Sequence, residues 1–202
     1  MDIGVDQIHQ RITFPLRDLS GTLVGISGRD YTETSAMKYK VYDLEYEDFG
    51  MPMHRTSKSH LLWNGHVVYP QMHHVKMPLI IVEGFKACMK VVQAGAFNTI
   101  ATIGNICSGI QRQLIERMAS EAWLFYDNHG PGMRGTVISG MNFGIPVRVI
   151  PYPDDREQPS DLNVGEIQLA LACAKDFTRW LQETPDAFEV YLDRRQRRQN
   201  NT

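Results

Sequence analysis

Two apolar segments, about forty residues apart, each lead directly into an acidic residue, and this pattern constrains the fold of the chain most. Residues 79–82 are followed by Glu83, and residues 122–126 are followed by Asp127. In open parallel α/β sheets, ligands bind in the crevice outside the carboxyl ends of the strands. We therefore predict that the two acids meet at one edge of such a sheet and form the active site.

The chain around these segments alternates between strand and helix patterns, which indicates a parallel sheet with right-handed crossovers. Strands are predicted over 79–82, 99–104, 122–126 and 147–150, and helices over 85–94, 109–120 and 133–141. Residues 164–195 are predicted to be mostly helical, with a break at Pro185.

The N-terminal part has a different pattern. Residues 11–16 and 22–29 alternate apolar with polar side chains around a turn, which predicts a β-hairpin. A further strand is predicted over 37–42, a short helix in the first ten residues, a turn at Asn64 and Gly65, and a linker over 73–78. We thus predict an α/β protein with an N-terminal mixed α/β basic subdomain (1–75), a parallel-sheet domain (76–157) and a short helical C-terminal segment (158–202) with a basic tail.

Composition is that of a soluble globular protein, with 43% hydrophobic and 22% charged residues. We expect no membrane span and no secretory signal, because no apolar run is long enough and the first residues are neither basic nor apolar. Cys88, Cys107 and Cys173 are predicted to be buried thiols in a reducing compartment.

Net charge is −2, so any nucleic-acid binding must be local. Basic residues gather at Arg11, Arg17 and Arg29, at Lys38 and Lys40, at Arg55 and Lys58, and over residues 194–198. On spacing alone, a solvated surface explains them better than a binding site.

Two carboxylates beside glycines suit magnesium, which binds few protein ligands and keeps positions for water and phosphate. Gly84, Gly130 and Gly132 would let a phosphate approach backbone N–H groups at a helix start. The alternative is that Glu83 or Asp127 merely caps a helix.

Other polar residues have two interpretations each. Arg134 would clamp a phosphate or lie on the surface, and Lys86 would pair with an acid or reach a phosphate. Asp161, which forms a third acidic group with Asp154 and Asp155, would bind metal or cap the last helices. The grouped histidines at 60, 66, 73 and 74 suggest a zinc site, but their spacing does not match that of a structural zinc site.

These motifs resemble the RNA-polymerase core of a DnaG-type primase, including its Toprim domain, over about residues 11 to 165. The family's apolar-Val-Glu-Gly motif is similar to residues 79–85, LIIVEGF, and its Asp-x-Asp motif is similar to residues 127–132, DNHGPG. Its upstream strand pair is similar to residues 11–29, RITFPLRDLSGTLVGISGR. Its Lys-Tyr pair is similar to Lys38-Tyr39, and its Asp-Pro loop to residues 158–162, QPSDL. The similarity of residues 11–29 favours a primase over the other classes of protein that contain a Toprim domain.

The chain departs from the family at three positions. His129 replaces the second aspartate of Asp-x-Asp, Pro131 replaces a small residue, and Gln158 replaces the first aspartate of the later loop. Imidazole is a poorer magnesium ligand than carboxylate and suits manganese or zinc better. A shifted metal preference and a weakened metal site are therefore two alternatives to an ordinary magnesium site. These departures are also compatible with a primase of phage or mobile-element type.

The resemblance implies a DNA primase, a nucleotidyltransferase that makes short RNA primers on single-stranded DNA from ribonucleoside triphosphates with Mg²⁺ or Mn²⁺. It implies catalytic roles for Glu83, Asp127 and His129, which would bind the metal together with Asp161. Nucleotide or DNA contacts are expected from a set of basic residues: Arg17, Arg29, Lys38, Lys40, Lys86 and Arg134. Tyr39 or Trp63 would stack a base.

Two alternatives remain beside primer synthesis: a Toprim metal-dependent nuclease, and a primase-like module that binds nucleic acid or a replisome partner without turnover. The family's zinc-ribbon cysteines and helicase-sized domain have no counterpart in this sequence. Template recognition and helicase coupling, if present, are therefore expected from other chains, such as a separate zinc-binding chain or a replicative helicase, or from further parts of a longer protein. The expected location is the cytoplasm of a bacterial or phage-infected cell.

Overall fold

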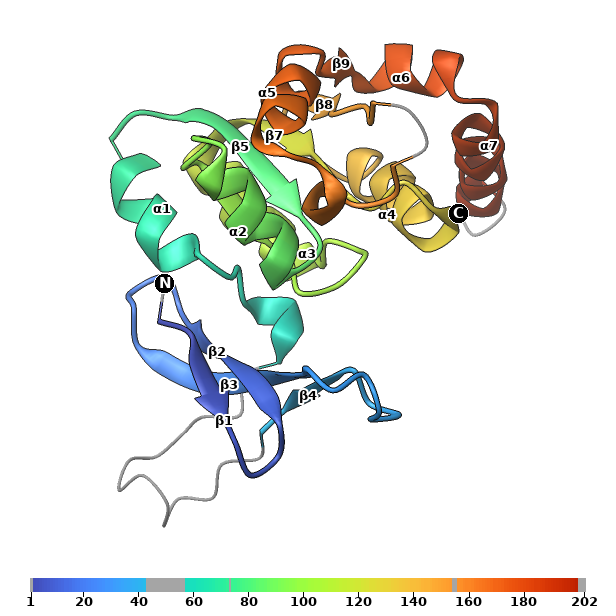
Figure 1. The fold of residues 1–202 in the computed structure, drawn as a ribbon. Coiled ribbons are helices and arrows are strands. Elements are labelled where there is room, and N and C mark those ends of the chain that lie inside the picture. Colours follow the sequence, from blue (N-terminus) through green and yellow to red (C-terminus); the bar gives the residue numbers. More distant parts are fainter. Residues whose placement is uncertain (1, 43–56, 73, 154–155, 200–202) are drawn as a thin grey trace.

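Two β-sheets organise the computed structural model, which describes residues 2–42, 57–72, 74–153 and 156–199 (Figure 1). The first sheet belongs to the N-terminal part, and the second sheet, with its helices, takes up most of the rest. The mixed α/β fold confirms the predicted class. In the described ranges, no helix is long and apolar enough to cross a bilayer.

The first sheet is antiparallel, with strands in the order β1-β2-β3-β4. Its strands are β1 (Gly4–Asp6), β2 (Arg11–Arg17), β3 (Leu23–Asp30) and β4 (Tyr39–Val41). The predicted hairpin is confirmed, and Gly21 at φ 90° makes its turn. The short helix predicted in the first ten residues is wrong, because these residues pair with β2 instead. Pairing with a neighbouring strand outweighs a weak local preference.

The second sheet has the order β6-β5-β7-β8-β9. Its strands are β5 (Met77–Val82), β6 (Thr99–Ala101), β7 (Ala119–Leu124), β8 (Val147–Val149) and β9 (Lys175–Asp176). The first four are parallel, as predicted. The two-residue β9 was not predicted and runs antiparallel to β8 at the edge.

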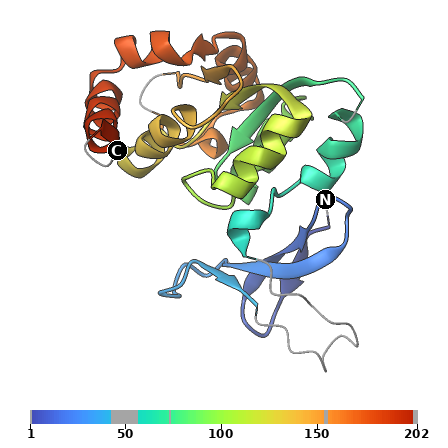
Figure 2. The same cartoon turned by 180° about the vertical axis from the view of Figure 1, so that it is seen from behind.

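Helices cover both faces of this sheet (Figures 1 and 2). They are α1 (Gly65–Met72), α2 (Phe85–Gln93), α3 (Gly109–Met118), α4 (Gly130–Gly140) and α5 (Val164–Ala172). Buried residues of α2 and α5 share one core with the first sheet, whereas those of α1 and α3 pack in a second core on the other face.

Helix α1 was missed by the sequence analysis. The turn signal at Asn64 is genuine, since this residue has φ 67°, but the helix begins directly after it. Val68 and Met72 are fully buried against the second sheet, so tertiary packing stabilises a segment that contains Pro70. The domain boundaries given above stay a prediction.

Aromatic side chains join the first sheet to the second. The rings of Phe14 on β2 and Phe85 at the start of α2 stack with centroids 4.5 Å apart and an interplanar angle of 3°. Trp63 meets Phe85 edge-on at 5.1 Å, and its Nε1 donates a hydrogen bond to the carbonyl of Pro15 at 3.1 Å. These contacts hold β2 and β3 against the residues that follow Glu83.

The C-terminal part is helical, as predicted, and consists of η3 (Pro159–Asp161), α5, α6 (Phe177–Glu183) and α7 (Pro185–Gln199). Pro185 is the first residue of α7, which confirms the predicted break. Cys173 at the end of α5 is exposed, so the prediction of a buried thiol is wrong there.

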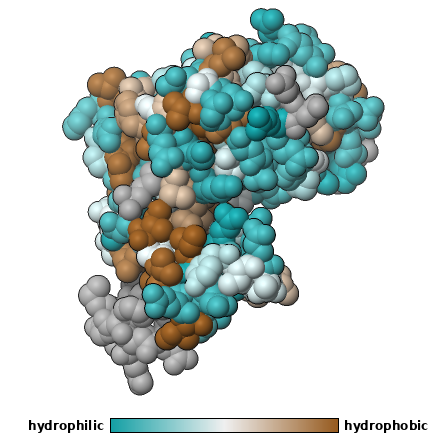
Figure 3. Space-filling model, in the orientation of Figure 1, coloured by the Kyte–Doolittle hydropathy of each residue, from teal (hydrophilic) through white to brown (hydrophobic). Residues whose placement is uncertain are grey.

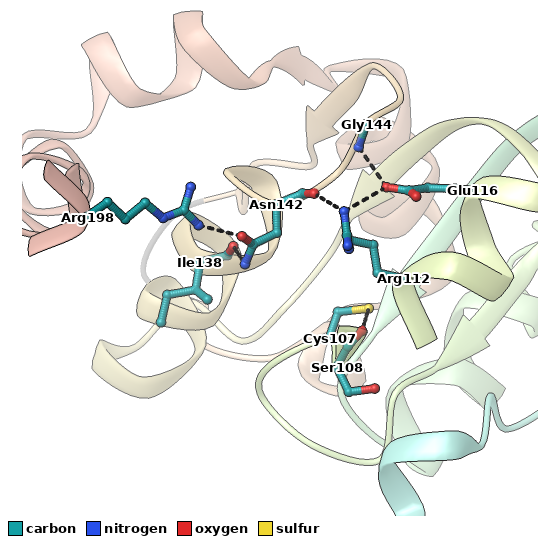
Figure 4. Close-up of polar contacts among 8 residues, drawn as sticks. All are labelled: Cys107, Ser108, Arg112, Glu116, Ile138, Asn142, Gly144 and Arg198. Atoms are coloured by element: carbon teal, nitrogen blue, oxygen red, sulfur yellow. Dashed lines mark hydrogen bonds and ion pairs between the residues drawn. The ribbon is translucent and has the colours of Figure 1, made fainter. Parts of the chain in front are cut away.

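Polar contacts attach α7 to the body of the protein (Figure 4). Arg198 donates to Oδ1 of Asn142 at 2.5 Å, and Arg112 on α3 donates to the carbonyl of Asn142 at 2.7 Å. Glu116 accepts a bond from the amide of Gly144 at 2.7 Å. The turn after α4 therefore links α3 to the last helix.

Candidate active site

The two predicted acids lie side by side at the carboxyl ends of neighbouring strands. Strands β5 and β7 pair in parallel, and each is followed by one of the acids. The backbone amide of Asp127 donates a hydrogen bond to Oε1 of Glu83 at 3.1 Å. The alternative that either acid only caps a helix is wrong, because Gly84 and His129 occupy the N-cap positions of α2 and α4.

Helix α4 passes very close to this pair. A Cβ atom on Gly132 would lie 2.2 Å from the carbonyl oxygen of Asp127 and 2.6 Å from Oε1 of Glu83. Only glycine fits at this position. The loop glycines that suggested close approach of a phosphate therefore also allow close approach of the helix itself.

Burial and nearby acidic charge disturb both carboxylates. The pKa of Glu83 is raised to about 7, first by burial and then by the charge of Asp127, while the hydrogen bond from the Asp127 amide opposes the rise. Burial also raises the pKa of Asp127, with Asp161 adding to the rise and His129 and Lys38 opposing it. Two half-buried like charges favour a bound cation, so the pair fits a divalent metal that keeps most of its other positions for water and phosphate.

A cavity of about 360 Å³ opens between the two sheets over this pair. The acids that follow β5 and β7 meet basic and aromatic side chains from the first sheet, from the segment that joins the sheets and from the start of α2. The lining includes Ser27, Arg29, Lys38, Tyr39, Lys58, Glu83, Phe85, Lys86, Asp127, Gln158, Ser160 and Asp161. In Figure 3 the molecule narrows at this level, and hydrophilic residues border the right-hand side of the waist.

The first sheet contributes Arg29 and Lys38, which form the basic wall of the cavity, and the register of β3 and β4 brings these two residues together. Arg29 pairs with Tyr39 across β3 and β4, and its guanidinium lies 5.8 Å from the centroid of the Tyr39 ring. Lys38 directly precedes β4 and faces the same cavity. Burial raises the pKa of Tyr39, the nearby Asp127 raises it too, and Arg29 lowers it.

Lys58 is a cavity residue that the sequence analysis did not select as a site residue. It begins the short helix η2 (Lys58–His60), which follows a segment outside the described residues. The grouping of Arg55 and Lys58 was the available signal, but the sequence around it has no periodicity from which the direction of the Lys58 side chain could be predicted.

Six predicted site residues line the cavity: Arg29, Lys38, Glu83, Lys86, Asp127 and Asp161. Asp161 lies in η3 and does not cap α5, because Asn163 holds that position. His129 lies beside the lining, with its Nε2 3.6 Å from Oδ2 of Asp127.

Three predicted basic residues lie away from the lining of the cavity. Arg17 borders a separate cavity of about 150 Å³, where it donates to the carbonyl of Gly21 and pairs with Asp2 at 3.1 Å. Lys40 and Arg134 are exposed on β4 and α4.

The structure leaves several suggestions untested. Arg55, His73, Asp154 and Asp155 lie outside the described residues. Among the residues that are described, no three His, Cys, Asp or Glu side chains are grouped closely enough to hold a metal ion. A metal ion bound at this site would therefore depend first on the Glu83 and Asp127 pair.

Known proteins similar to this chain are DNA primases, although no family model matches it. The DNA primase of Staphylococcus aureus is 30% identical over 151 residues, which make up 73% of this chain and 24% of that protein. The DNA primase of Borreliella burgdorferi is 26% identical over 192 residues, 94% of this chain and 34% of that protein. The chain thus spans about a quarter to a third of the length of these relatives.

Solved structures with a similar fold are catalytic portions of primases. The zinc-binding and RNA-polymerase domains of the Aquifex aeolicus primase match with a TM-score of 0.69 and 18% identity, over 87% of this chain and 43% of that one. The E. coli primase catalytic core matches with a TM-score of 0.67 and 19% identity, over 90% and 61% of the two chains. A DnaG primase catalytic domain bound to single-stranded DNA matches with a TM-score of 0.65 and 19% identity, over 92% and 62%.

Proposed function

Because this chain is a homologue of the bacterial DNA primases and has the fold of their catalytic cores, we propose that it makes RNA primers on single-stranded DNA. The observation that carries the proposal is the cavity that Glu83 and Asp127 line together with four basic residues: Arg29, Lys38, Lys58 and Lys86. Acids for a divalent cation and bases for phosphate oxygens are the two groups that nucleotidyl transfer needs.

The acidic side of the cavity would hold Mg²⁺ or Mn²⁺. Glu83 and Asp127 are the proposed ligands, with Asp161 on the cavity wall and His129 beside Asp127 as additional ones. When bound, the cation neutralises charge that develops on the attacking and leaving oxygens of the transfer. The end of the primer, whose hydroxyl oxygen is the attacking group, would approach from the open side of the cavity.

The basic side would bind the incoming nucleotide and the template. Lys38, Lys58 and Lys86 would contact triphosphate oxygens, and Arg29 would fix the Tyr39 ring, on which a base would stack. Arg17, Lys40 and Arg134 lie outside the cavity lining, so we assign them, if they bind DNA, to the template backbone. One similar primase domain is known bound to single-stranded DNA, which supports this choice of template.

The remaining functions of a primase would come from other segments or other chains, since this chain spans only part of its relatives. We propose a zinc-binding chain for template recognition and a replicative helicase as partner. The proposed setting is the cytoplasm of a bacterial or phage-infected cell.

The test is template-dependent incorporation of ribonucleotides on single-stranded DNA, with Mn²⁺ and with Mg²⁺. We expect RNA products from the wild-type chain and none from Glu83→Gln, while the variant keeps its binding to single-stranded DNA. Glu189→Gln on the exposed face of α7 is the matched control and should retain activity. Cleavage of nucleic acid without incorporation would show that the chain is a nuclease and not a polymerase. Binding of nucleic acid without turnover under either metal would show that it is only a binding module.

A further inference from the structure

The cavity residue Lys58 is carried by a helix that cannot hold its own position. Helix η2 has three residues, buries none of its side chains, and is closed by the bonds from the His60 amide to the Ser57 carbonyl and from the Leu61 amide to the Lys58 carbonyl. Such a short turn is marginal by itself. Its position at the cavity must therefore come from contacts with the rest of the protein.

Gln111 on α3 supplies those contacts. Its side-chain nitrogen lies 3.2 Å from the Lys58 carbonyl, 2.7 Å from the Leu61 carbonyl and 2.8 Å from the Thr102 carbonyl. Its side-chain oxygen accepts a bond from the amide of Ser108 at 2.9 Å. Gln111 is only 2% exposed, so these bonds are made without competition from water.

The N-cap of the same helix adds a further bond. Ser108 accepts from the amide of Gln111 at 3.1 Å, which completes the capping box, and its hydroxyl donates to the carbonyl of Ser59 at 2.5 Å. Two side chains from one helical turn thus bind three carbonyls of residues 58–61. These bonds attach η2 to α3.

Gln111 also contacts the acidic side of the cavity through Thr102. The amide of Thr102 donates to the carbonyl of Val82 at 3.0 Å, and the amide of Gly104 donates to the carbonyl of Glu83 at 3.2 Å. The amide group of Gln111 therefore bridges the segment that carries Lys58 and the loop that contacts Glu83.

We propose that Gln111 is a positioning residue that sets the place of Lys58 opposite the Glu83 and Asp127 pair, so that a nucleotide's triphosphate is bound between them. This inference rests on the proposed function. Gln111 touches neither nucleotide nor metal, and it acts through the two backbone segments that it joins.

Gln111→Glu separates the two functions of the side chain. The carboxylate still accepts the bond from the Ser108 amide and so keeps the helix cap, but it cannot donate to the three carbonyls. Gln113→Glu is the matched control, because Gln113 is exposed on the same helix and the variant adds the same charge. Gln111→Met and Gln113→Met repeat the comparison without a charge.

Amide hydrogen exchange over residues 58–61 measures the attachment. We expect exchange there to speed up about tenfold or more in both Gln111 variants, which corresponds to the loss of at least one buried bond, and to stay unchanged in both Gln113 variants. Unchanged exchange in the Gln111 variants would overturn the inference, whatever the activity of the protein.

Binding of ATP with Mn²⁺ and no template measures the consequence for the site. Lys58→Ala and Gln111→Glu are each expected to weaken binding about tenfold, and the double variant should bind about as weakly as Lys58→Ala alone, because both changes remove the same contact. Multiplied effects in the double variant, or a wild-type chain that binds no ATP, would overturn the inference. A wild-type chain that binds ATP but makes no RNA would overturn primer synthesis alone.

Discussion

The Cβ atom that Gly132 lacks would lie within 2.6 Å of both acids of the site, whereas a Cβ on Gly130 would meet nothing within 4 Å. At the scale of single residues, the site thus depends on one close approach of α4. We expect Gly132→Ala to cost about 1–3 kcal/mol of unfolding free energy, because the added methyl displaces the Asp127 carbonyl, and to weaken binding of Mn²⁺.

Urea denaturation and Mn²⁺ titration of the two alanine variants check this expectation. Gly130→Ala should be neutral or slightly stabilising, because alanine is the better helix former and the site is open. Equal stability and equal metal affinity in both variants would show that the close approach is not needed.

Glu83 should make the metal-free protein less stable as the pH rises. Its pKa is about 7 in the folded protein against an ordinary value of 4.5, so the unfolded chain loses its proton first. Stability should fall between pH 4.5 and 7 and remain lower above that range, by on the order of 1–2 kcal/mol after solvent screening is allowed for.

Glu83→Gln removes this titration, so without metal at pH 8 the inactive variant should be more stable than the wild type. Thermal unfolding at pH 5 and pH 8 measures the difference, and Glu189→Gln serves as the exposed control. Added Mn²⁺ should stabilise the wild type more than the variant. A Glu83→Gln variant less stable than the wild type at pH 8 would contradict the electrostatic argument.

His129 should set the choice of metal. Its imidazole lies 3.6 Å from the Asp127 carboxylate. His129 stands where the Asp-x-Asp motif of the DnaG-type primases, which this sequence resembles, has its second aspartate. Because carboxylate oxygen suits magnesium better than imidazole does, His129→Asp should raise the ratio of magnesium-supported to manganese-supported RNA synthesis. An unchanged ratio would show that the side chain is not a ligand.

At the scale of elements, the strands and helices with strong patterns were predictable, and those that depend on partners were not. The strands predicted over 79–82 and 11–16 are found as β5 (Met77–Val82) and β2 (Arg11–Arg17). Helix α1 and strand β9 lack such a pattern, and they form because α1 packs against the second sheet and β9 pairs with β8. Their stabilisation comes from contacts with residues distant in the sequence.

The element contact that matters most for the site is between β2 and α2. Phe14 is 3% exposed and stacks on Phe85, so Phe14→Ala should cost about 3–5 kcal/mol of unfolding free energy and separate the basic wall from the acids. Phe97→Ala, at a position 47% exposed, should cost less than about 1 kcal/mol.

Urea denaturation measures both costs, and Phe14→Leu is the milder variant if alanine prevents folding. A similar cost at Phe14 and Phe97 would contradict the importance of the stacked pair. A Phe14 variant that folds but keeps full ATP binding would show that the two sheets need not be held this closely.

At the scale of the whole molecule, the proposed function requires a chain with net charge −2 to bind DNA through local basic residues, which we assign to Arg17, Lys40 and Arg134. Binding of single-stranded DNA should weaken as salt rises, and Lys40→Ala, at an exposed position on β4, should reduce the logarithmic salt slope by about 0.7, the value for one phosphate contact on a single strand. Titrations at several salt concentrations measure the slope. Arg117→Ala, on the exposed face of α3, should leave it unchanged, and an equal fall in both variants would contradict the assignment.

By itself the sequence determined the alternation of strands and helices from β5 to β8 and the position of an acid directly after β5 and after the segment that contains β7. These features are local, because side-chain periodicity and the end of an apolar run are properties of a few consecutive residues. The meeting of Glu83 and Asp127 follows almost as directly, since neighbouring parallel strands end at the same edge.

Only the tertiary structure decided which basic residues face those acids. Side chains alternate along a strand, so Tyr39 turns toward the cavity and Lys40 away from it, and the outcome depends on which face of the first sheet packs against α2. Lys58 joins the site because Gln111 binds its segment from fifty residues along the chain. Contacts between such distant segments have no signature in local sequence.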